Sequence, residues 1–273
     1  MESQLYTPES RQRLLERLGS VLREDSRIGG AVHVGSGARE EADRWADLDV
    51  VAVVQRNEDA LNVFGDWREA LEGALPVLWC FEDVRGPEVG LYAIILEDFM
   101  ELDISFQSLG VLSAHSPNWR ILFDRTDEIE AIMSRPPDRD ERAELEETYC
   151  RRLDSIWHYV THVAVSIKRG KPWRALFYLQ EMRDRTIEIE GLLCECTTKH
   201  FREVDDLPAD RLAALERTLV GTVRADTVAQ VLIAATECFF DTAARAEEAC
   251  GIKRAENLRT AMGEYLELMG IQR

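Results

Sequence analysis

The chain has 273 residues, of which 45% are hydrophobic, and its formal net charge is −18. That length is enough for one large domain or two ordinary ones, and the hydrophobic content suits a globular core. No stretch approaches the roughly 18 uninterrupted apolar residues of a membrane helix. The acidic surface argues against a nucleic-acid substrate, because nucleic-acid binding needs cationic patches, and it favours a cationic small molecule or a divalent metal ion.

The N-terminus and the cysteines indicate the cellular compartment. Residues 1–6 have neither the basic nor the apolar segment of a signal peptide. The six cysteines show no CxxC spacing, so the sequence indicates neither a zinc site nor a redox pair. Reduced thiols are typical of the cytoplasm. We therefore expect a soluble cytoplasmic protein.

The first predicted elements are a helix over residues 8–23 and a strand over residues 28–34. Leucine and valine recur at helical spacing in the first segment, with Thr7 as a plausible N-cap and Pro8 in the first turn. The second segment is a short apolar run that contains His33, for which we expect a structural role. It leads directly into the sequence Gly35-Ser36-Gly37.

A second strand follows after a polar stretch. Residues 37–46 are polar and are predicted to begin with a short helical turn, whereas residues 49–54 form an almost continuous β-branched run. Such a run is expected of a strand that is buried on both faces. Residues two apart in a strand point to the same side, so Asp47 and Asp49 present both carboxylates to one face. Leu48 then points into the core.

The remaining elements of the first half are a helix and further strands. We predict a helix over 60–74, a strand over 77–81, and a hairpin of strands 91–96 and 100–106. The hairpin is joined by the acidic pair Glu97-Asp98, and within its second strand Glu101, Asp103 and Ser105 share one face. A short final strand is predicted over 121–125.

Residues 135–138, Arg-Pro-Pro-Asp, are the strongest breaker in the chain and mark the predicted domain boundary. Almost everything beyond them is helical in period, with helices predicted at about 140–169, 172–197, 209–220, 224–250 and 253–270. The predicted fold class is therefore α+β. A mixed sheet with helices would occupy residues 1–137, and an all-α bundle would occupy residues 138–273.

The segment from Gly35 to Asp49 combines two features that are each common alone. A Gly-Ser-Gly sequence is a turn in most proteins, and an Asp-x-Asp sequence is usually a solvated strand end. Paired carboxylates repel each other unless a cation lies between them, and Mg²⁺ is commonly held by one or two carboxylates, waters and substrate phosphates. Turn N–H groups and a serine hydroxyl can bind phosphate oxygens. Together, at this spacing, the two features predict phosphoryl or nucleotidyl transfer.

The pattern Gly35-Ser36 … Asp47-Leu48-Asp49 resembles the motif of the nucleotidyltransferase superfamily that includes the aminoglycoside and lincosamide antibiotic nucleotidyltransferases. Residues 168–176, Lys-Arg-Gly-Lys-Pro-Trp-Arg-Ala-Leu, carry a looser resemblance to the helical half of such enzymes. One departure is Glu40, which stands where many relatives have a glycine after the arginine equivalent to Arg39. The resemblance implies a nucleotidyltransferase catalytic domain followed by a helical acceptor-binding domain.

The acidic residues are assigned to metal binding and catalysis. We expect Asp47 and Asp49 to bind Mg²⁺, which would bridge the carboxylates and the phosphates of a nucleoside triphosphate (NTP). The resemblance implies a third carboxylate from a later strand, for which Asp103 is the best match and Glu101 the competitor. Asp103 would be either a third metal ligand or the base that takes the proton of the acceptor hydroxyl.

Nucleotide binding is expected of residues in both halves. Ser36 and the backbone of Gly35 and Gly37 would hold the phosphates, and Arg39 could supply a further donor. Lys168 and Lys171 lie at a helix end, where a cation is favourable whatever the function. They could also reach the triphosphate.

The sequence thus predicts a Mg²⁺-dependent enzyme. It would move a nucleoside monophosphate (NMP) from an NTP to a hydroxyl of a small molecule, an aminoglycoside or a lincosamide, and release pyrophosphate. Neither nucleic acid nor membrane is an expected partner, and the chain would be a monomer or a homodimer. Two alternatives stay open: NMP transfer to a protein hydroxyl, as in AMPylating toxin-like relatives, and a non-catalytic nucleotide-binding protein of the same fold. The three intact acidic positions count against the non-catalytic alternative.

Overall fold

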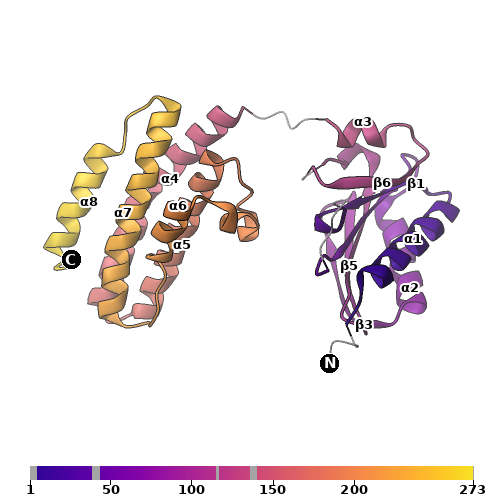
Figure 1. Cartoon of the computed structure of the whole chain (residues 1–273), viewed down its shortest axis with the longest axis horizontal. Helices are drawn as coiled ribbons and strands as arrows, with labels where there is room; N and C mark the ends of the chain where they lie inside the picture. Colours follow the sequence, from indigo (N-terminus) through magenta and orange to yellow (C-terminus); the bar gives the residue numbers. More distant parts are fainter. Residues whose placement is uncertain (1–4, 39–43, 115–116, 136–139, 273) are drawn as a thin grey trace. The chain divides into compact units, whose positions relative to one another are not determined.

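The computed structural model describes residues 5–38, 44–114, 117–135 and 140–272. The chain divides into two compact units, Met1–Pro137 and Asp138–Arg273 (Figure 1). The first unit holds a six-stranded mixed sheet with helices, and the described part of the second unit holds helices and no strand. The predicted α+β fold class is confirmed.

The sheet contains one parallel pair at its centre. In spatial order its strands are β3 (Val77–Val84), β4 (Val89–Leu96), β5 (Glu101–Ser108), β2 (Leu48–Val54), β1 (Ile28–Val34) and β6 (Trp119–Asp124). Strands β2 and β5 run parallel, and the other neighbouring pairs are antiparallel. The parallel register places Asp49 opposite Asp103. Two residues that are far apart in the sequence thereby become neighbours.

The two faces of the sheet are covered differently. Helices α1 (Pro8–Glu24) and α2 (Ala60–Ala74) lie along one face and bury a large core there (Figure 1). In β2, Leu48 and Val50 belong to this core, whereas Val51 belongs to a smaller core on the other face, where α3 (Ile129–Met133) packs. Asp49 alternates with Leu48 and Val50, so it lies on the face opposite α1 and α2. We call this face the open face.

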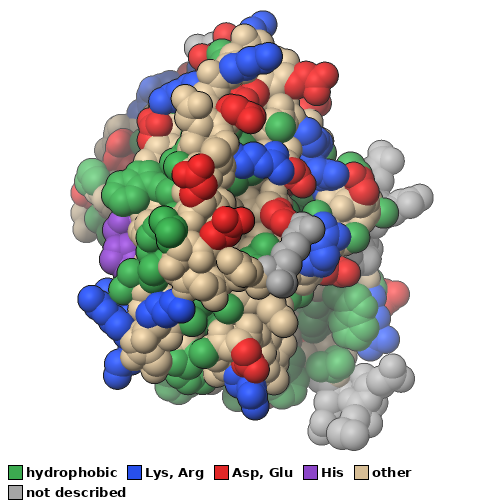
Figure 2. Space-filling view, turned by 90° about the vertical axis from the view of Figure 1, so that its left-hand side faces the viewer, with side chains coloured by type: hydrophobic (Ala, Val, Ile, Leu, Met, Phe, Trp, Pro, Cys, Tyr) green, Lys and Arg blue, Asp and Glu red, His purple; other side chains and the backbone are tan. Residues whose placement is uncertain are grey.

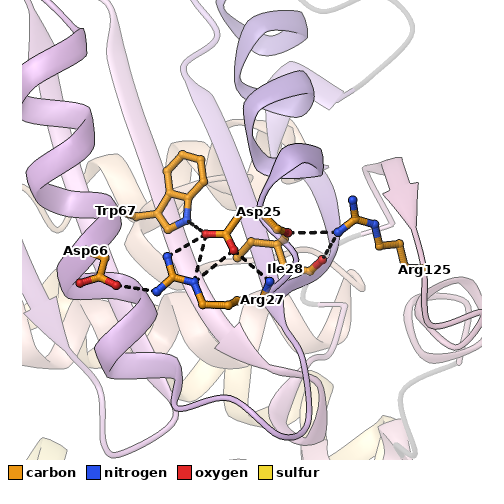
Figure 3. A network of polar contacts seen from close by, with 6 residues as sticks. All are labelled: Asp25, Arg27, Ile28, Asp66, Trp67 and Arg125. Carbon is orange, nitrogen blue, oxygen red and sulfur yellow. Dashed lines mark hydrogen bonds and ion pairs between the residues drawn. The ribbon is translucent and has the colours of Figure 1, made fainter.

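A polar network fixes the start of β1 against α2 and the chain after β6 (Figure 3). The carboxylate of Asp25, just after α1, accepts a hydrogen bond from the Trp67 indole at 2.9 Å and pairs with Arg27 at 2.8 Å. Arg27 also pairs with Asp66 at 2.5 Å, and Arg125 donates to the backbone carbonyl of Asp25 at 3.0 Å. Hydrogen bonds from Arg27, opposed by burial, lower the pKa of Asp25 to about 2. The network therefore stays charged over the physiological pH range.

The second unit is a helical bundle. Its long helices are α4 (Glu141–Lys168), α5 (Pro172–Leu193) and α7 (Ala225–Cys250), and its shorter helices are α6 (Ala209–Glu216) and α8 (Glu256–Leu268). The three long helices share one hydrophobic core that includes Tyr149, Leu179 and Phe239. Cationic and anionic side chains are interspersed with hydrophobic ones on the side shown in Figure 2. None of the described helices combines the length and the apolar character that crossing a bilayer requires.

Several element boundaries differ from those predicted. The helix predicted to end at residue 197 ends at Leu193, because Glu195 adopts a left-handed φ of 56°. The helix predicted to begin at residue 253 begins at Glu256, since the backbone N–H groups of Arg254 and Ala255 bind the Glu247 carboxylate instead. The helix predicted to end at residue 220 ends at Glu216.

The strands also depart from the prediction in detail. The hairpin of β4 and β5 is present, but its connection is longer than the predicted Glu97-Asp98 turn. Phe99 adopts a left-handed φ of 63° and donates its backbone N–H to Leu96. The strand predicted to end at residue 81 continues to Val84, and β6 begins at Trp119 rather than at residue 121. The short helix α3 was not predicted, because five residues are too few to show a helical period.

Candidate functional site

Asp49 and Asp103 lie side by side on the open face. They are register partners in the parallel pair of β2 and β5, and both are partly buried. Their strand neighbours Leu48 and Leu102 are fully buried on the opposite face, which fixes the direction of the two carboxylates. Adjacent strands lie about 4.8 Å apart, so the two carboxylates are within reach of one small ligand.

The turn after β1 lies directly against these carboxylates. Gly35 has a φ of 77°, and a Cβ built on it would lie 2.1 Å from Oδ2 of Asp49. Residues Ser36–Ala38 form one 3₁₀ turn, and the Ser36 hydroxyl donates to Oδ1 of Asp47 at 3.3 Å. A Cβ at Gly37 would lie 2.7 Å from the backbone oxygen of Asp47. The glycines therefore permit an approach that a side chain would block.

Asp103 carries a perturbed carboxyl. Its Oδ1 is buried and has no hydrogen-bond partner. Burial first, and then the negative charges of Glu101 and Asp47, raise its pKa to about 6. A carboxylate in this position is stabilised either by a proton or by a cation.

Two residues of the N-terminal segment hold the chain just before Asp47. The guanidinium of Arg11 in α1 donates to the carbonyl of Ala46 at 2.5 Å, and Arg11 itself is buried. The Tyr6 hydroxyl donates to the carbonyl of Trp45 at 3.1 Å. Sequence reasoning did not identify Arg11. The signal was available, because Arg11 lies three and four residues before Leu14 and Leu15 and so belongs to the apolar stripe of its helix.

His33 supports the turn from the side of α1. It is 2% exposed, and neither of its ring nitrogens has a hydrogen-bond partner. Its Nε2 would lie 3.1 Å from a Cβ at Gly37. Burial, together with the positive charges of Arg120 and Arg11, lowers the pKa of His33 to about 4. The imidazole is therefore neutral at pH 7.

The carboxylates of this site resemble the ligands that Mg²⁺ prefers in proteins. Among the described residues, no three His, Cys, Asp or Glu side chains are grouped so that they could hold a metal ion by themselves. Mg²⁺ seldom requires such a cage, since it keeps several waters and binds one or two carboxylates plus substrate phosphates. The unpartnered oxygen of Asp103 and the neighbouring charge of Asp47 fit a cation of this kind. That Asp47, Asp49 and Asp103 bind Mg²⁺ stays a prediction.

Glu101 can be placed relative to the site, whereas Arg39 and Glu40 cannot. Arg39 and the neighbouring Glu40 lie outside the described residues. Glu101 is exposed and alternates with the buried Leu102, so it shares the open face with Asp103. Glu101 therefore contributes charge to the site.

Lys168 and Lys171 lie at the junction of α4 and α5 in the helical unit. Lys171 lines a cleft of about 180 Å³ together with Arg169, Arg174, His162 and other residues. Lys168 is the last residue of α4, and its ammonium group would lie 3.5 Å from a Cβ at Gly270. Sequence reasoning named the two lysines but not the two arginines, although both arginines lie in the same stretch. Nucleotide binding by Lys168 and Lys171 stays a prediction.

No protein-family model and no curated protein matches the chain. Among solved structures, an aminoglycoside 6-adenyltransferase from Bacillus subtilis is similar, with 13% identity and a TM-score of 0.44 over 96% of this chain and 99% of that chain. A nucleotidyltransferase-like protein from Exiguobacterium sibiricum 255-15 is similar with 9% identity and a TM-score of 0.43 over 96% of this chain and 91% of that chain. Both likenesses are distant, so the assignment of a function depends on the site itself.

Proposed function

We propose that this protein is a Mg²⁺-dependent nucleotidyltransferase that moves an NMP from an NTP to a hydroxyl of a small molecule. One observation carries the proposal: a glycine-serine turn lies against Asp49, and Asp49 is the register partner of Asp103. A surface that can bind phosphate is thereby next to a pair of partly buried carboxylates. Phosphoryl chemistry needs both, because it depends on holding a phosphate and compensating its charge.

The turn would bind the NTP through its backbone and one side chain. The absence of side chains at Gly35 and Gly37 lets phosphate oxygens approach the backbone N–H groups. The Ser36 hydroxyl, which donates to Asp47, can donate to a phosphate oxygen instead. Buried Arg11 keeps the adjoining backbone in place through the carbonyl of Ala46. Binding at the turn therefore needs no rearrangement of the strands.

The carboxylates would organise the transfer. Asp47 and Asp49 would hold Mg²⁺, which would supply charge compensation for the triphosphate in the transition state, and Asp103 would act beside them. In the transfer, the acceptor oxygen forms a bond to the α-phosphorus, and the bond from that phosphorus to the bridging oxygen of pyrophosphate breaks. Asp103 would accept the proton of the acceptor hydroxyl through its buried Oδ1, which has no hydrogen-bond partner. Pyrophosphate leaves with the electron pair of the broken bond.

The acceptor class follows from charge. Residues 1–135 hold 26 acidic residues against 13 arginines and no lysine. A surface of this sign attracts cationic acceptors, so aminoglycosides lead and amine-bearing lincosamides follow. The same charge disfavours a polyanionic acceptor.

A screen for transferred mass tests the proposal. The full chain is incubated with Mg²⁺, each of several NTPs and a panel of aminoglycosides and lincosamides, and the products are weighed by mass spectrometry. We expect an acceptor heavier by one NMP together with stoichiometric pyrophosphate. Label on a protein band instead would indicate protein modification, and binding of nucleotide without transfer would indicate a non-catalytic protein. Either result would contradict the proposal.

A further inference from the structure

Two aromatic side chains are exposed on the edge of the sheet. Trp79 and Phe81 of β3 are 75% and 59% exposed. In the register of β3 and β4, Trp79 pairs with Ile95 and Phe81 pairs with Ala93. These partners alternate with Ile94, which is buried beneath α1 and α2, so all four lie on the open face. We call Trp79, Phe81, Ala93 and Ile95 the aromatic surface.

The aromatic surface belongs to the same row of residues as the candidate site. Strand pairing links Phe81 to Ala93, Ala93 to Asp103, Asp103 to Asp49, and Asp49 to Val34 without a break. Phe81 is therefore two strands from Asp103, or about 10 Å at the usual spacing of strands. The turn that begins after Val34 lies on the other side of the carboxylates from Phe81. The carboxylates thus separate the aromatic surface from the turn.

This order matches the needs of a transfer reaction. In-line displacement requires the leaving pyrophosphate and the attacking acceptor on opposite sides of the reacting phosphorus. If the turn holds the phosphates, the opposite side of the carboxylates is the acceptor side. Asp103 is the carboxylate next to the aromatic surface, and it is also the residue to which we assign proton removal.

The charge around the aromatic surface selects the kind of acceptor. A second row links Trp79 through Ile95 to the exposed Glu101. The positive charge of Arg85 also acts on Asp103. Arg85 is paired with Asp83 at 2.6 Å, which leaves Glu101 and Asp103 as the carboxylates next to the aromatic surface. An ammonium group is attracted both by carboxylates and by the faces of aromatic rings. An anionic acceptor is disfavoured by both.

We propose that Trp79 and Phe81 form the acceptor-binding surface, and that the acceptor is an amino-substituted hydroxyl compound whose ring or alkyl face packs on them. Its ammonium group lies against the aromatic rings and Glu101, and its hydroxyl is directed to Asp103. The assignment of this ligand as the acceptor rests on the proposed nucleotidyltransferase function. Binding of the amine itself does not.

A second copy of the chain is the competing occupant, because exposed apolar edge strands pair readily with other strands. Two features of β3 oppose that pairing. Glu82 and Asp83 already pair with Arg68 at 3.0 Å and Arg85 at 2.6 Å, so a two-fold pairing of β3 strands would crowd four charged pairs at the edge. A bulge between Val77 and Trp79 also interrupts the strand. The observations therefore favour a small cationic ligand.

The test measures binding in the absence of nucleotide. Kanamycin and lincomycin serve as amine probes, and sucrose serves as an amine-free sugar, with affinities measured by calorimetry on the full chain. Trp79→Ala and Phe81→Ala are compared with Val84→Ala. Val84 is a matched control: it is 52% exposed on the same strand but pairs with Gly90, which lies against Phe64 of α2 on the opposite face.

We expect at least one amine probe to bind the wild type and sucrose not to bind. Each aromatic substitution should weaken amine binding about tenfold, since it removes both a packing surface and a cation–π contact. Val84→Ala should leave the affinity within twofold. All three variants should melt at the wild-type temperature, because the replaced side chains are exposed.

Three results would overturn this inference: no amine probe binds the wild type, the aromatic variants bind as tightly as Val84→Ala, or light scattering shows a dimer that Phe81→Ala dissociates. Parallel turnover assays distinguish it from the proposed function. An acceptor that is turned over with an unchanged KM in Phe81→Ala would refute the surface and leave the nucleotidyltransferase intact. Amine binding that depends on Phe81, with no NMP transfer under any condition, would support the aromatic surface and refute the nucleotidyltransferase function.

Discussion

Gly35 lies so close to Asp49 that a Cβ at position 35 would be 2.1 Å from the carboxylate oxygen Oδ2. Gly35 also has a φ of 77°, a conformation that L side chains rarely adopt. Two separate constraints therefore act on one residue. Backbone strain affects the stability of the fold, whereas the clash displaces a carboxylate of the candidate site.

Gly35→Ala tests this contact. The left-handed backbone should destabilise the fold by about 1–2 kcal/mol. The displaced carboxylate should in addition reduce Mg²⁺-dependent NTP affinity by more than tenfold. Gly86→Ala is the control, because Gly86 has a φ of 84° but nothing within 4 Å of a built Cβ. Chemical unfolding and nucleotide titration measure the two effects, and equal NTP affinity in both variants would count against the contact.

Mg²⁺ binding should release a proton from Asp103. Without metal its pKa is about 6, raised by burial and by Glu101 and Asp47, and a bound cation lowers it. The affinity for Mg²⁺ should therefore fall as the pH drops from 7 to 5, with proton release greatest below pH 6. Calorimetry in buffers of different ionisation enthalpy counts the protons. Asp103→Asn should abolish the release, and release that persists in this variant would assign it to another group.

His33 should make the protein sensitive to mild acid. Its folded pKa is about 4 and its ordinary value is 6.5, so the unfolded state gains a proton first as the pH falls below 6.5. Stability is then lost between pH 6.5 and pH 4, by up to about 3 kcal/mol. The raised pKa of Asp103 acts in the opposite direction, which makes a variant comparison necessary. Urea unfolding of His33→Leu should show a smaller loss over this range, whereas an unchanged loss would exclude His33 as the cause.

Lys171 should contribute to NTP binding if the cleft at the start of α5 receives phosphate. The cleft also contains Arg169 and Arg174, and removing one of several cations near a phosphate weakens binding without abolishing it. We expect Lys171→Ala to raise the NTP KM about tenfold and to leave kcat within twofold. Lys253→Ala, another lysine of the helical unit, should change neither constant. Equal kinetics in the two variants would remove Lys171 from the nucleotide site.

The side-chain directions at the site could be predicted from sequence, but the pairing of strands could not. Alternation within a strand indicates that Asp47 and Asp49 point to one side of their strand, and that Glu101 and Asp103 point to one side of theirs. That Asp49 is the register partner of Asp103 depends on a parallel pairing across more than fifty residues, which local patterns do not encode. The aromatic surface escaped prediction for the same reason.

Helix ends were predicted well where their signals are local. Thr7 caps α1 through a reciprocal hydrogen-bond pair with Ser10, as expected of an N-cap followed by proline. The end of α5 and the start of α8 were missed, since they depend on the left-handed backbone of Glu195 and on the distant carboxylate of Glu247. Contacts of this kind form only in the folded chain.

The role of Asp49 in metal binding is measured by the rate of pyrophosphate release by Asp49→Asn with Mg²⁺, an NTP and a responsive acceptor. We expect a fall of at least a hundredfold, since the substitution removes a metal-binding charge without changing shape. Asp127→Asn is the control: Asp127 is exposed and follows the end of β6 that pairs with the start of β1, away from the turn. A hundredfold loss in Asp49→Asn with full activity in the control would support the account. Turnover by Asp49→Asn at the wild-type rate would contradict it.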